Sequence, residues 1–209
     1  MPNAKGVDVS HHQNAVDWQA VVNDGYSFAF IRASYVGQKS RVANPDRMFD
    51  VHWHGASATG LLLGIYHYFV PQPNCTDQID FFWAQIQGRN HHFPLILDCE
   101  FSGGDNPAVL TPCIQACLDR LEQLAGRKPM IYTRGNWWNA HVLNQLPAAN
   151  YNLWVANYQN PTGPIVPTAW QTWRFWQFAE NATVPGVAGP ADVNWFNGDV
   201  NALRAFAGV

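Results

Sequence analysis

Charged side chains are scarce in this chain of 209 residues, since Asp, Glu, Lys and Arg together make up 13% of it. About a quarter is usual for a globular protein. The formal net charge is only −3, and Lys and Arg form no run longer than the pair Arg127-Lys128. Proteins that bind nucleic acid cluster basic side chains on one surface. We therefore expect no nucleic-acid partner.

Long apolar runs are also missing. The longest, from Leu61 to Val70, is interrupted by His67 and falls well short of the roughly 20 apolar residues that a membrane-spanning helix needs. Residues 1–5 lack the apolar core of a secretory signal. We expect no membrane contact, and a chain that is either made without a signal or already trimmed.

Cysteine is rare, with Cys75, Cys99, Cys113 and Cys117 as its only occurrences. They form no CxxC pair and no zinc-ligand spacing. Cys113 and Cys117 lie four apart on a predicted helix, where Cβ atoms about 5–6 Å apart fit a disulfide poorly. We expect reduced, buried thiols.

Aromatic residues are plentiful instead, with ten Trp, seven Tyr and twelve Phe. Most are expected in the core. The others favour a groove, because aromatic rings commonly line sites where flat apolar faces meet polar edges, and sugar rings present such faces.

Apolar, β-branched or aromatic segments alternate with helical ones along most of the chain. The predicted strands are 6–9, 28–31, 61–69, 94–99, 130–132, 153–156 and 175–178, and the predicted helices, one after each of the first five strands, are 16–23, 45–58, 76–87, 111–124 and 136–143. We expect Thr76 and Thr111 to cap their helices, with Pro112 in the first helical position.

This alternation predicts parallel strands buried beneath helices, as a barrel or an open doubly wound sheet. From Asn150 onward, loops rich in Pro and Gly replace the helices. We therefore predict an α/β fold, a modified TIM-like barrel of about five βα units followed by about three helix-poor strands. The length suits a single domain over residues 1–209.

Four acidic residues lie in or beside predicted strands: Asp8, Asp98, Glu100 and Asp192. A charge embedded in an apolar strand is costly to bury unless it is paired or used. Other acidic residues fall in or beside predicted helices, where we expect solvated faces: Asp17, Asp24, Asp46, Asp50, Asp77, Asp80, Asp119 and Glu122.

Asp98 and Glu100 are two residues apart on one strand, so they face the same side with Cα atoms about 6.5–7 Å apart. Repulsion between them raises the pKa of at least one, which suits an acid that stays protonated beside an ionised neighbour. Strand ends of this kind lie at the mouth of a parallel barrel, where Asp8 also arrives. The pattern is typical of glycosidases. The alternative is that both residues are structural partners of Arg32 or Arg134.

Four motifs, in order between about Lys5 and Leu203, resemble glycoside hydrolase family 25, the Chalaropsis-type lysozymes that include many phage and bacterial endolysins. They are Asp8-Val9-Ser10-His11-His12-Gln13, Asp98-Cys99-Glu100, Trp176-Gln177-Phe178 and Asp192-Val193-Asn194-Trp195-Phe196-Asn197-Gly198. His12 is a departure, because an aromatic such as Trp is frequent there in relatives.

The resemblance implies a single catalytic domain that hydrolyses the β-1,4 bond between N-acetylmuramic acid and N-acetylglucosamine in peptidoglycan, without a cofactor. It implies Glu100 as general acid/base and Asp98 as its partner, which either orients the substrate's N-acetyl group or acts more directly. Asp8 and Asp192 complete the acidic floor. We expect a monomer that acts on the cell wall, outside the cell or in the periplasm, exported by host lysis or trimmed beforehand.

Further side chains at strand ends are candidate sugar contacts: Tyr66, Tyr68, Arg32, Trp154 and Gln177. Tyr66 and Tyr68 are two apart, so both face one side of their strand.

Other functions fit less well. Three histidine pairs suggest a metal site: His11-His12, His52-x-His54 and His91-His92. Adjacent residues rarely ligate one ion, so we expect no metal. A Mg²⁺ phosphodiesterase would place Lys or Arg near the carboxylates. A glycan-binding module on an inactive barrel, or a hydrolase of another N-acetylated glycan such as chitin, stays open. A binding module could lose Glu100, so its presence favours the enzyme.

Overall fold

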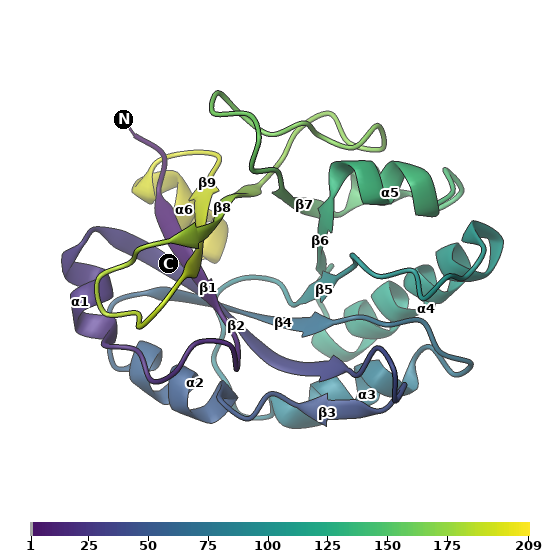
Figure 1. Ribbon diagram of the computed structural model, residues 1–209, viewed down its shortest axis with the longest axis horizontal. Helices are drawn as coiled ribbons and strands as arrows, with labels where there is room; N and C mark the ends of the chain where they lie inside the picture. Colours follow the sequence, from purple (N-terminus) through teal and green to yellow (C-terminus); the bar gives the residue numbers. More distant parts are fainter. Residues whose placement is uncertain (1) are drawn as a thin grey trace.

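The computed structural model describes residues 2–209. Its strands form one sheet that closes on itself, because β1 pairs with both β9 and β2 (Figure 1). Around the sheet the order is β1 (Lys5–Val9), β9 (Ala191–Phe196), β8 (Phe175–Ala182), β7 (Asn152–Ala156), β6 (Met130–Arg134), β5 (Ile96–Asp98), β4 (Leu62–Tyr68), β2 (Tyr26–Val36) and the added β3 (Ala43–Pro45).

The pairings confirm the predicted modified barrel. From β1 through β2, β4, β5, β6 and β7 to β8, each barrel strand runs parallel to the next. β9 is antiparallel to both of its neighbours. Parallel neighbours need a crossover connection, whereas antiparallel strands can be joined by a hairpin, so the barrel closes without another helix.

Helices cover the outside of the ring of strands (Figure 1). They are α1 (Trp18–Asn23), α2 (Phe49–Ser57), α3 (Asp77–Gln85), α4 (Pro107–Ala125) and α5 (Gly135–His141). A short 3-10 turn at Ala148–Asn150 precedes β7, and a last helix, α6 (Val200–Ala207), follows β9. The five βα units and the helix-poor strands β7, β8 and β9 match the prediction. None of the helices in residues 2–209 is long and apolar enough to cross a membrane.

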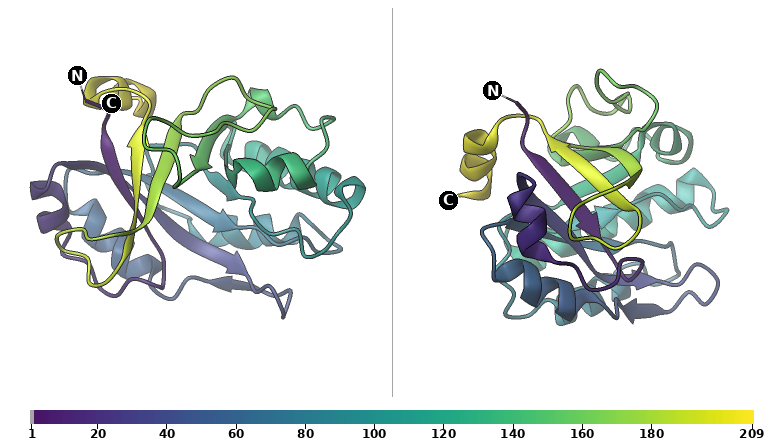
Figure 2. Two further views of the ribbon diagram at one scale, coloured as in Figure 1. Left: turned by 45° about the horizontal axis from the view of Figure 1, so that its top comes forward. Right: turned by 60° about the vertical axis from the view of Figure 1, so that its left-hand side comes forward.

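Helix α6 was not predicted, although its signals are present. Asp199 Oδ1 accepts a hydrogen bond from the Ala202 N–H and so caps the helix. Leu203 and Phe206 pack into the aromatic cluster at the closed end of the barrel. Figure 2 shows α6 beside the N-terminal end of the chain, where Ala4 N–H donates to Gly198 O.

The predicted start of α4 is wrong. The helix begins at Pro107, and the Asn106 side chain caps it by accepting from the Ala108 N–H. Thr111 lies a turn further on, where its Oγ1 accepts from the Leu143 N–H at 2.9 Å, and Pro112 lies inside the helix. Thr76 stands at the start of α3 as predicted, but its side chain makes no capping hydrogen bond.

Side chains that point into the barrel are apolar at one end and polar at the other. Along β2 the inward positions run Phe28, Phe30, Arg32, and on β8 Phe175 is followed by Gln177. The phenylalanines pack edge to face with one another. Gly64 on β4 makes room for them, because a Cβ there would lie 2.6 Å from Phe30 Cδ1. The barrel is therefore plugged at one end and polar at the other.

One disulfide corrects the expectation of reduced thiols. Cys75 and Cys113 are bonded, with Cα atoms 5.4 Å apart, while Cys99 and Cys117 are free and buried. Helix α4 packs against α3 and brings Cys113 to the loop before α3. Sequence spacing could not show this, because the two residues are 38 positions apart.

Loss of this disulfide is expected to lower the free energy of unfolding by about 4 kcal/mol, because it frees the loop that the bond closes in the unfolded chain. Urea unfolding measures the difference in the free energy of unfolding between the oxidised wild type and the Cys75→Ser, Cys113→Ser double variant. Dithiothreitol should destabilise the wild type and leave the variant unchanged. An equal effect of the reductant on both proteins would contradict the prediction.

Candidate active site

The polar end of the barrel holds a cleft of about 430 Å³. All of the predicted site residues line it: Asp8, Arg32, Tyr66, Tyr68, Asp98, Glu100, Trp154, Gln177 and Asp192. An adjoining cavity of about 460 Å³ shares Asp8, Glu100 and Asp192 and extends to Tyr158 and Glu180. Residues from the first and the last strand thus meet in one groove.

Strand register aligns the acidic groups. Asp8 on β1 lies directly opposite Asp192 on the antiparallel β9. Asp98 on β5 is level with Tyr68 on β4 and Tyr132 on β6. Because parallel strands in a barrel end at the same rim, these side chains share one layer at the mouth.

Asp8 is buried and tightly held. Its Oδ2 accepts hydrogen bonds from Gln177 Nε2 at 2.9 Å and from Asn194 Nδ2 at 2.7 Å. Burial raises the pKa of Asp8 to about 6, although the hydrogen bonds from these donors act in the opposite direction. Burial and the Asp8 charge raise the pKa of Asp192 to about 9. At neutral pH Asp8 is therefore the ionised member of the pair and Asp192 keeps its proton.

Asp98 is 5% exposed, and its Oδ1 has no hydrogen-bond partner among residues 2–209. Burial, then the charge of Glu100, raises its pKa well above the usual range, while Arg32 opposes this. A buried polar atom without a partner is costly. At the wall of a cleft it is also a free acceptor for a ligand.

Glu100 lies between solvent and the barrel interior, with its side chain 23% exposed. Arg134 Nε is 3.3 Å from Glu100 Oε2. Burial raises the pKa of Glu100, and the charges of Arg134 and Arg32 partly offset that rise. The predicted alternative, a structural partnership with an arginine, is thus present for Glu100 and Arg134. The pair lies on the wall of the groove, so the carboxyl stays accessible.

Asp46 corrects the sequence interpretation, which placed it on a solvated helix face. It is 3% exposed, and its Oδ2 accepts from Arg32 Nε at 2.8 Å and from the His11 N–H at 3.0 Å. Burial would raise the pKa of Asp46, but the Met48 N–H and Arg32 outweigh it and lower the pKa. Arg32 Nη2 also lies 2.8 Å from His11 Nδ1. Asp46 therefore anchors one wall of the cleft.

Sequence reasoning missed Tyr132, Tyr158 and the structural role of Asn194. Both tyrosine hydroxyls donate to Gln177 Oε1, at 2.8 and 2.6 Å, and Gln177 in turn holds Asp8. Asn194 Oδ1 accepts from Trp154 Nε1 at 2.8 Å. Tyr132 ends a predicted strand, so the strand-end rule that found Asp98 could have found it. Tyr158 lies in a loop and carried no such signal.

The histidine pairs do not converge. His52 Nε2 lies 3.2 Å from Ser10 O, while His91 and His92 contact the backbone of Phe93 and Leu63. Within residues 2–209 no three His, Cys, Asp or Glu side chains gather in a geometry that could hold a metal ion.

The sequence pattern of the family described as Glycosyl hydrolases family 25 matches residues 7–187. The chain belongs to this family. It is therefore an enzyme, a glycoside hydrolase, and the resemblance drawn from the four motifs is confirmed.

Relatives of this family 25 glycosyl hydrolase match it over nearly its whole length. Lysozyme M1 of Streptomyces globisporus is 32% identical over 97% of this chain and 71% of its own. The bacterial lysozyme of Streptomyces coelicolor has a solved structure that is 30% identical, covers 99% of this chain and 98% of its own, and superposes with a TM-score of 0.84. The solved structure of the family 25 lysozyme of Aspergillus fumigatus is 28% identical, covers 99% of this chain and 99% of its own, and superposes with a TM-score of 0.83.

Proposed function

We propose that Glu100, Asp98 and the pair Asp8 and Asp192 carry out the reaction of this enzyme, which is a peptidoglycan hydrolase, an N-acetylmuramidase. The observation that supports these roles is the gathering of four carboxyls with raised pKa values in one cleft. When neighbouring carboxyls have different pKa values, one can stay protonated and act as an acid while another is ionised and acts as a base.

Glu100 is the general acid in this proposal. Its raised pKa keeps the proton on the carboxyl in mildly acidic solution, and its exposure at the groove wall lets it reach a glycosidic oxygen. Protonation of that oxygen as the bond breaks removes the need to expel an alkoxide. Arg134 holds the carboxyl in place.

Asp98 orients the sugar that is attacked. Its unpartnered Oδ1 accepts the N–H of the substrate's N-acetyl group and turns the acetyl oxygen toward the anomeric carbon. In substrate-assisted glycosidases this oxygen takes the place of a carboxylate nucleophile. The ionised Asp8 then stabilises the positive charge that develops on the sugar ring, while Asp192 keeps its proton.

The remaining predicted contacts divide into two groups. Tyr66 and Tyr68 line the cleft and are proposed to contact sugar rings, with Trp154 behind them against both Tyr66 and Tyr132. Arg32 and Gln177 already use their polar atoms on Asp46, His11, Asp8 and the tyrosines. We therefore propose that Arg32 and Gln177 hold other side chains of the site in position.

The protein acts on the cell wall. A disulfide forms and persists in oxidising surroundings, which supports action outside the cell or in the periplasm. We propose that it works there as a monomer on glycan strands.

The bond that is cleaved tests this function. Mass spectrometry of fragments from purified peptidoglycan should find N-acetylmuramic acid at the new reducing ends. Release of N-acetylglucosamine reducing ends, or faster cleavage of chitin oligomers than of peptidoglycan, would overturn the assignment. Binding without cleavage would indicate the glycan-binding module.

The pH dependence of kcat/KM is expected to be bell-shaped with an acidic optimum. Activity falls at high pH as Glu100 loses its proton, and at low pH as the carboxyls that act ionised gain one. Asp192 keeps its proton in acidic solution, and its hydrogen bond lowers the pKa of Asp8. Asp192→Leu removes this donor without adding a polar group, so the pKa of Asp8 should rise and the acidic limb should move to higher pH. A flat wild-type profile from about pH 4 to 9 would contradict the assignment.

A further inference from the structure

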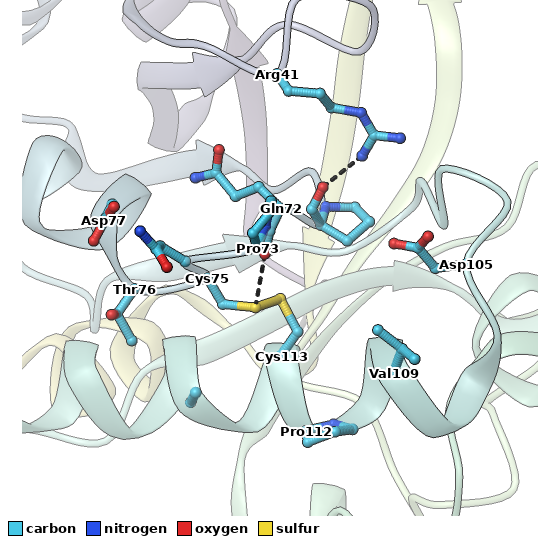
Figure 3. Close-up of a pocket in the computed structure, with 13 residues that line it drawn as sticks. Arg41, Gln72, Pro73, Cys75, Thr76, Asp77, Asp105, Val109, Pro112 and Cys113 are labelled. Carbon is cyan, nitrogen blue, oxygen red and sulfur yellow. Dashed lines mark hydrogen bonds between the residues drawn. A yellow bond between two sulfur atoms is a disulfide. The ribbon is translucent and has the colours of Figure 1, made fainter.

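A second cavity, of about 870 Å³, lies outside the catalytic cleft, next to the disulfide (Figure 3). Figure 3 shows Arg41 on one side of it, Asp77 and Asp105 on two others, and the bond between Cys75 and Cys113 along α4. The cavity is too large for the few solvent molecules that fill ordinary packing gaps, and its volume suits an organic ligand.

The two cavities have no lining residue in common, but two segments of the chain run from one to the other. The hairpin between β2 and β3 sends Gln38 to the cleft, where its Nε2 donates to Tyr68 Oη at 2.7 Å. Three residues on, Arg41 lines the second cavity and donates to Pro71 O and Gly103 O. The loop after β5 starts at Glu100 in the cleft and reaches Asp105 in the second cavity. The five residues from Glu100 to Asp105 span at most about 18 Å, a distance that an extended branch of a ligand held in the cleft can cover.

The walls carry charges of both signs that the protein leaves unpaired. Arg41, Asp77 and Asp105 take part in no ion pair among the described residues. Between them lie apolar surfaces, including Val109, which is 61% exposed on α4. A fitting ligand has carboxylates, an ammonium group and small apolar side chains.

We propose that this cavity binds the stem peptide of peptidoglycan, the short peptide attached to each N-acetylmuramic acid. The inference rests on the proposed function. Stem peptides carry free carboxylates, alanine methyl groups and, at the third residue, commonly a side-chain amine. Arg41 pairs with a carboxylate, Asp77 and Asp105 with the amine, and Val109 with a methyl group. The enzyme thereby selects glycan strands that carry peptides.

The test compares glycan strands with stem peptides and the same strands after an amidase has removed them. Arg41→Gln and Asp105→Asn should each raise KM about three- to fivefold on strands with stems, the loss expected for one exposed ion pair. Their kcat, and all constants on bare strands, should match the wild type. Asp119→Asn, an exposed change elsewhere on α4, is the matched control and should alter neither substrate.

Equal changes on both substrates, or none on either, would overturn the inference while leaving the muramidase function intact. If the wild type cleaves neither substrate, the function itself fails. Binding provides an independent measurement, because the tetrapeptide L-Ala-D-isoGln-L-Lys-D-Ala should shift the NMR signals of Val109 and its neighbours in the wild type. In Arg41→Gln the same shifts should need about three- to fivefold more peptide. Absence of shifts at millimolar peptide in the wild type would also overturn it.

Discussion

The Glu100→Gln variant is expected to lose about two to four orders of magnitude in kcat on purified peptidoglycan, since it removes the proton that the leaving oxygen needs. Gln has nearly the same shape as Glu and can still contact Arg134, so the fold and KM should change little. Turbidity loss of a peptidoglycan suspension, with initial rates at saturating substrate, measures the effect.

Glu122→Gln is the matched control. Glu122 lies on α4, 4.0 Å from Lys128 and half exposed, and is remote from the groove. The same chemical change there should leave kcat within about twofold of the wild type, because exposed ion pairs contribute little. Turnover near the wild-type rate in the Glu100 variant would remove Glu100 from the acid role. A loss shared by both variants would point to folding.

The central carboxylates could be predicted because a strand of period two fixes which side chains share a face. Asp98 and Glu100 follow an apolar strand, so their convergence required only that this strand end at the mouth of a barrel. The opposition of Asp8 and Asp192 is different, because it depends on β9 running antiparallel to β1. The strand pattern placed Asp8 at the barrel mouth, but only the resemblance to the family indicated that Asp192 belongs to the same site.

Groups that reach the site across tertiary contacts could not be found in this way. Asp46 precedes a helix and has the local pattern of a surface residue, yet Arg32 and His11 draw it into the interior. Tyr158 reaches Gln177 from a long loop whose path no local propensity fixes. The bond between Cys75 and Cys113 likewise depends on the packing of α4 against α3.

The Asp98→Asn variant is expected to lose about 10²- to 10³-fold in kcat, comparable to removing one preorganised polar group from an active site. An amide in this position can donate to the N-acetyl oxygen instead of accepting the N–H, so the acetyl group would turn the wrong way. Asp119→Asn, on the exposed face of α4, serves as the control and should retain full activity. Retention of activity in the Asp98 variant would reject its positioning of the acetyl group.

The same variant should be more stable than the wild type, and the gain should grow with pH. The folded pKa of Asp98 is raised above its unfolded value, so the folded state keeps a proton that the unfolded state has lost. Stability from this group is therefore lost as pH rises above the unfolded pKa, near 4. Asn cannot ionise and escapes that loss, on the order of 1–3 kcal/mol for a buried group without a partner. Urea unfolding at pH 4.5 and 7 should give the variant a higher free energy of unfolding than the wild type, mainly at pH 7. A variant less stable than the wild type at both values would mean that Asp98 supports the fold, whereas the expected result identifies a carboxyl whose burial costs stability and is retained for the reaction.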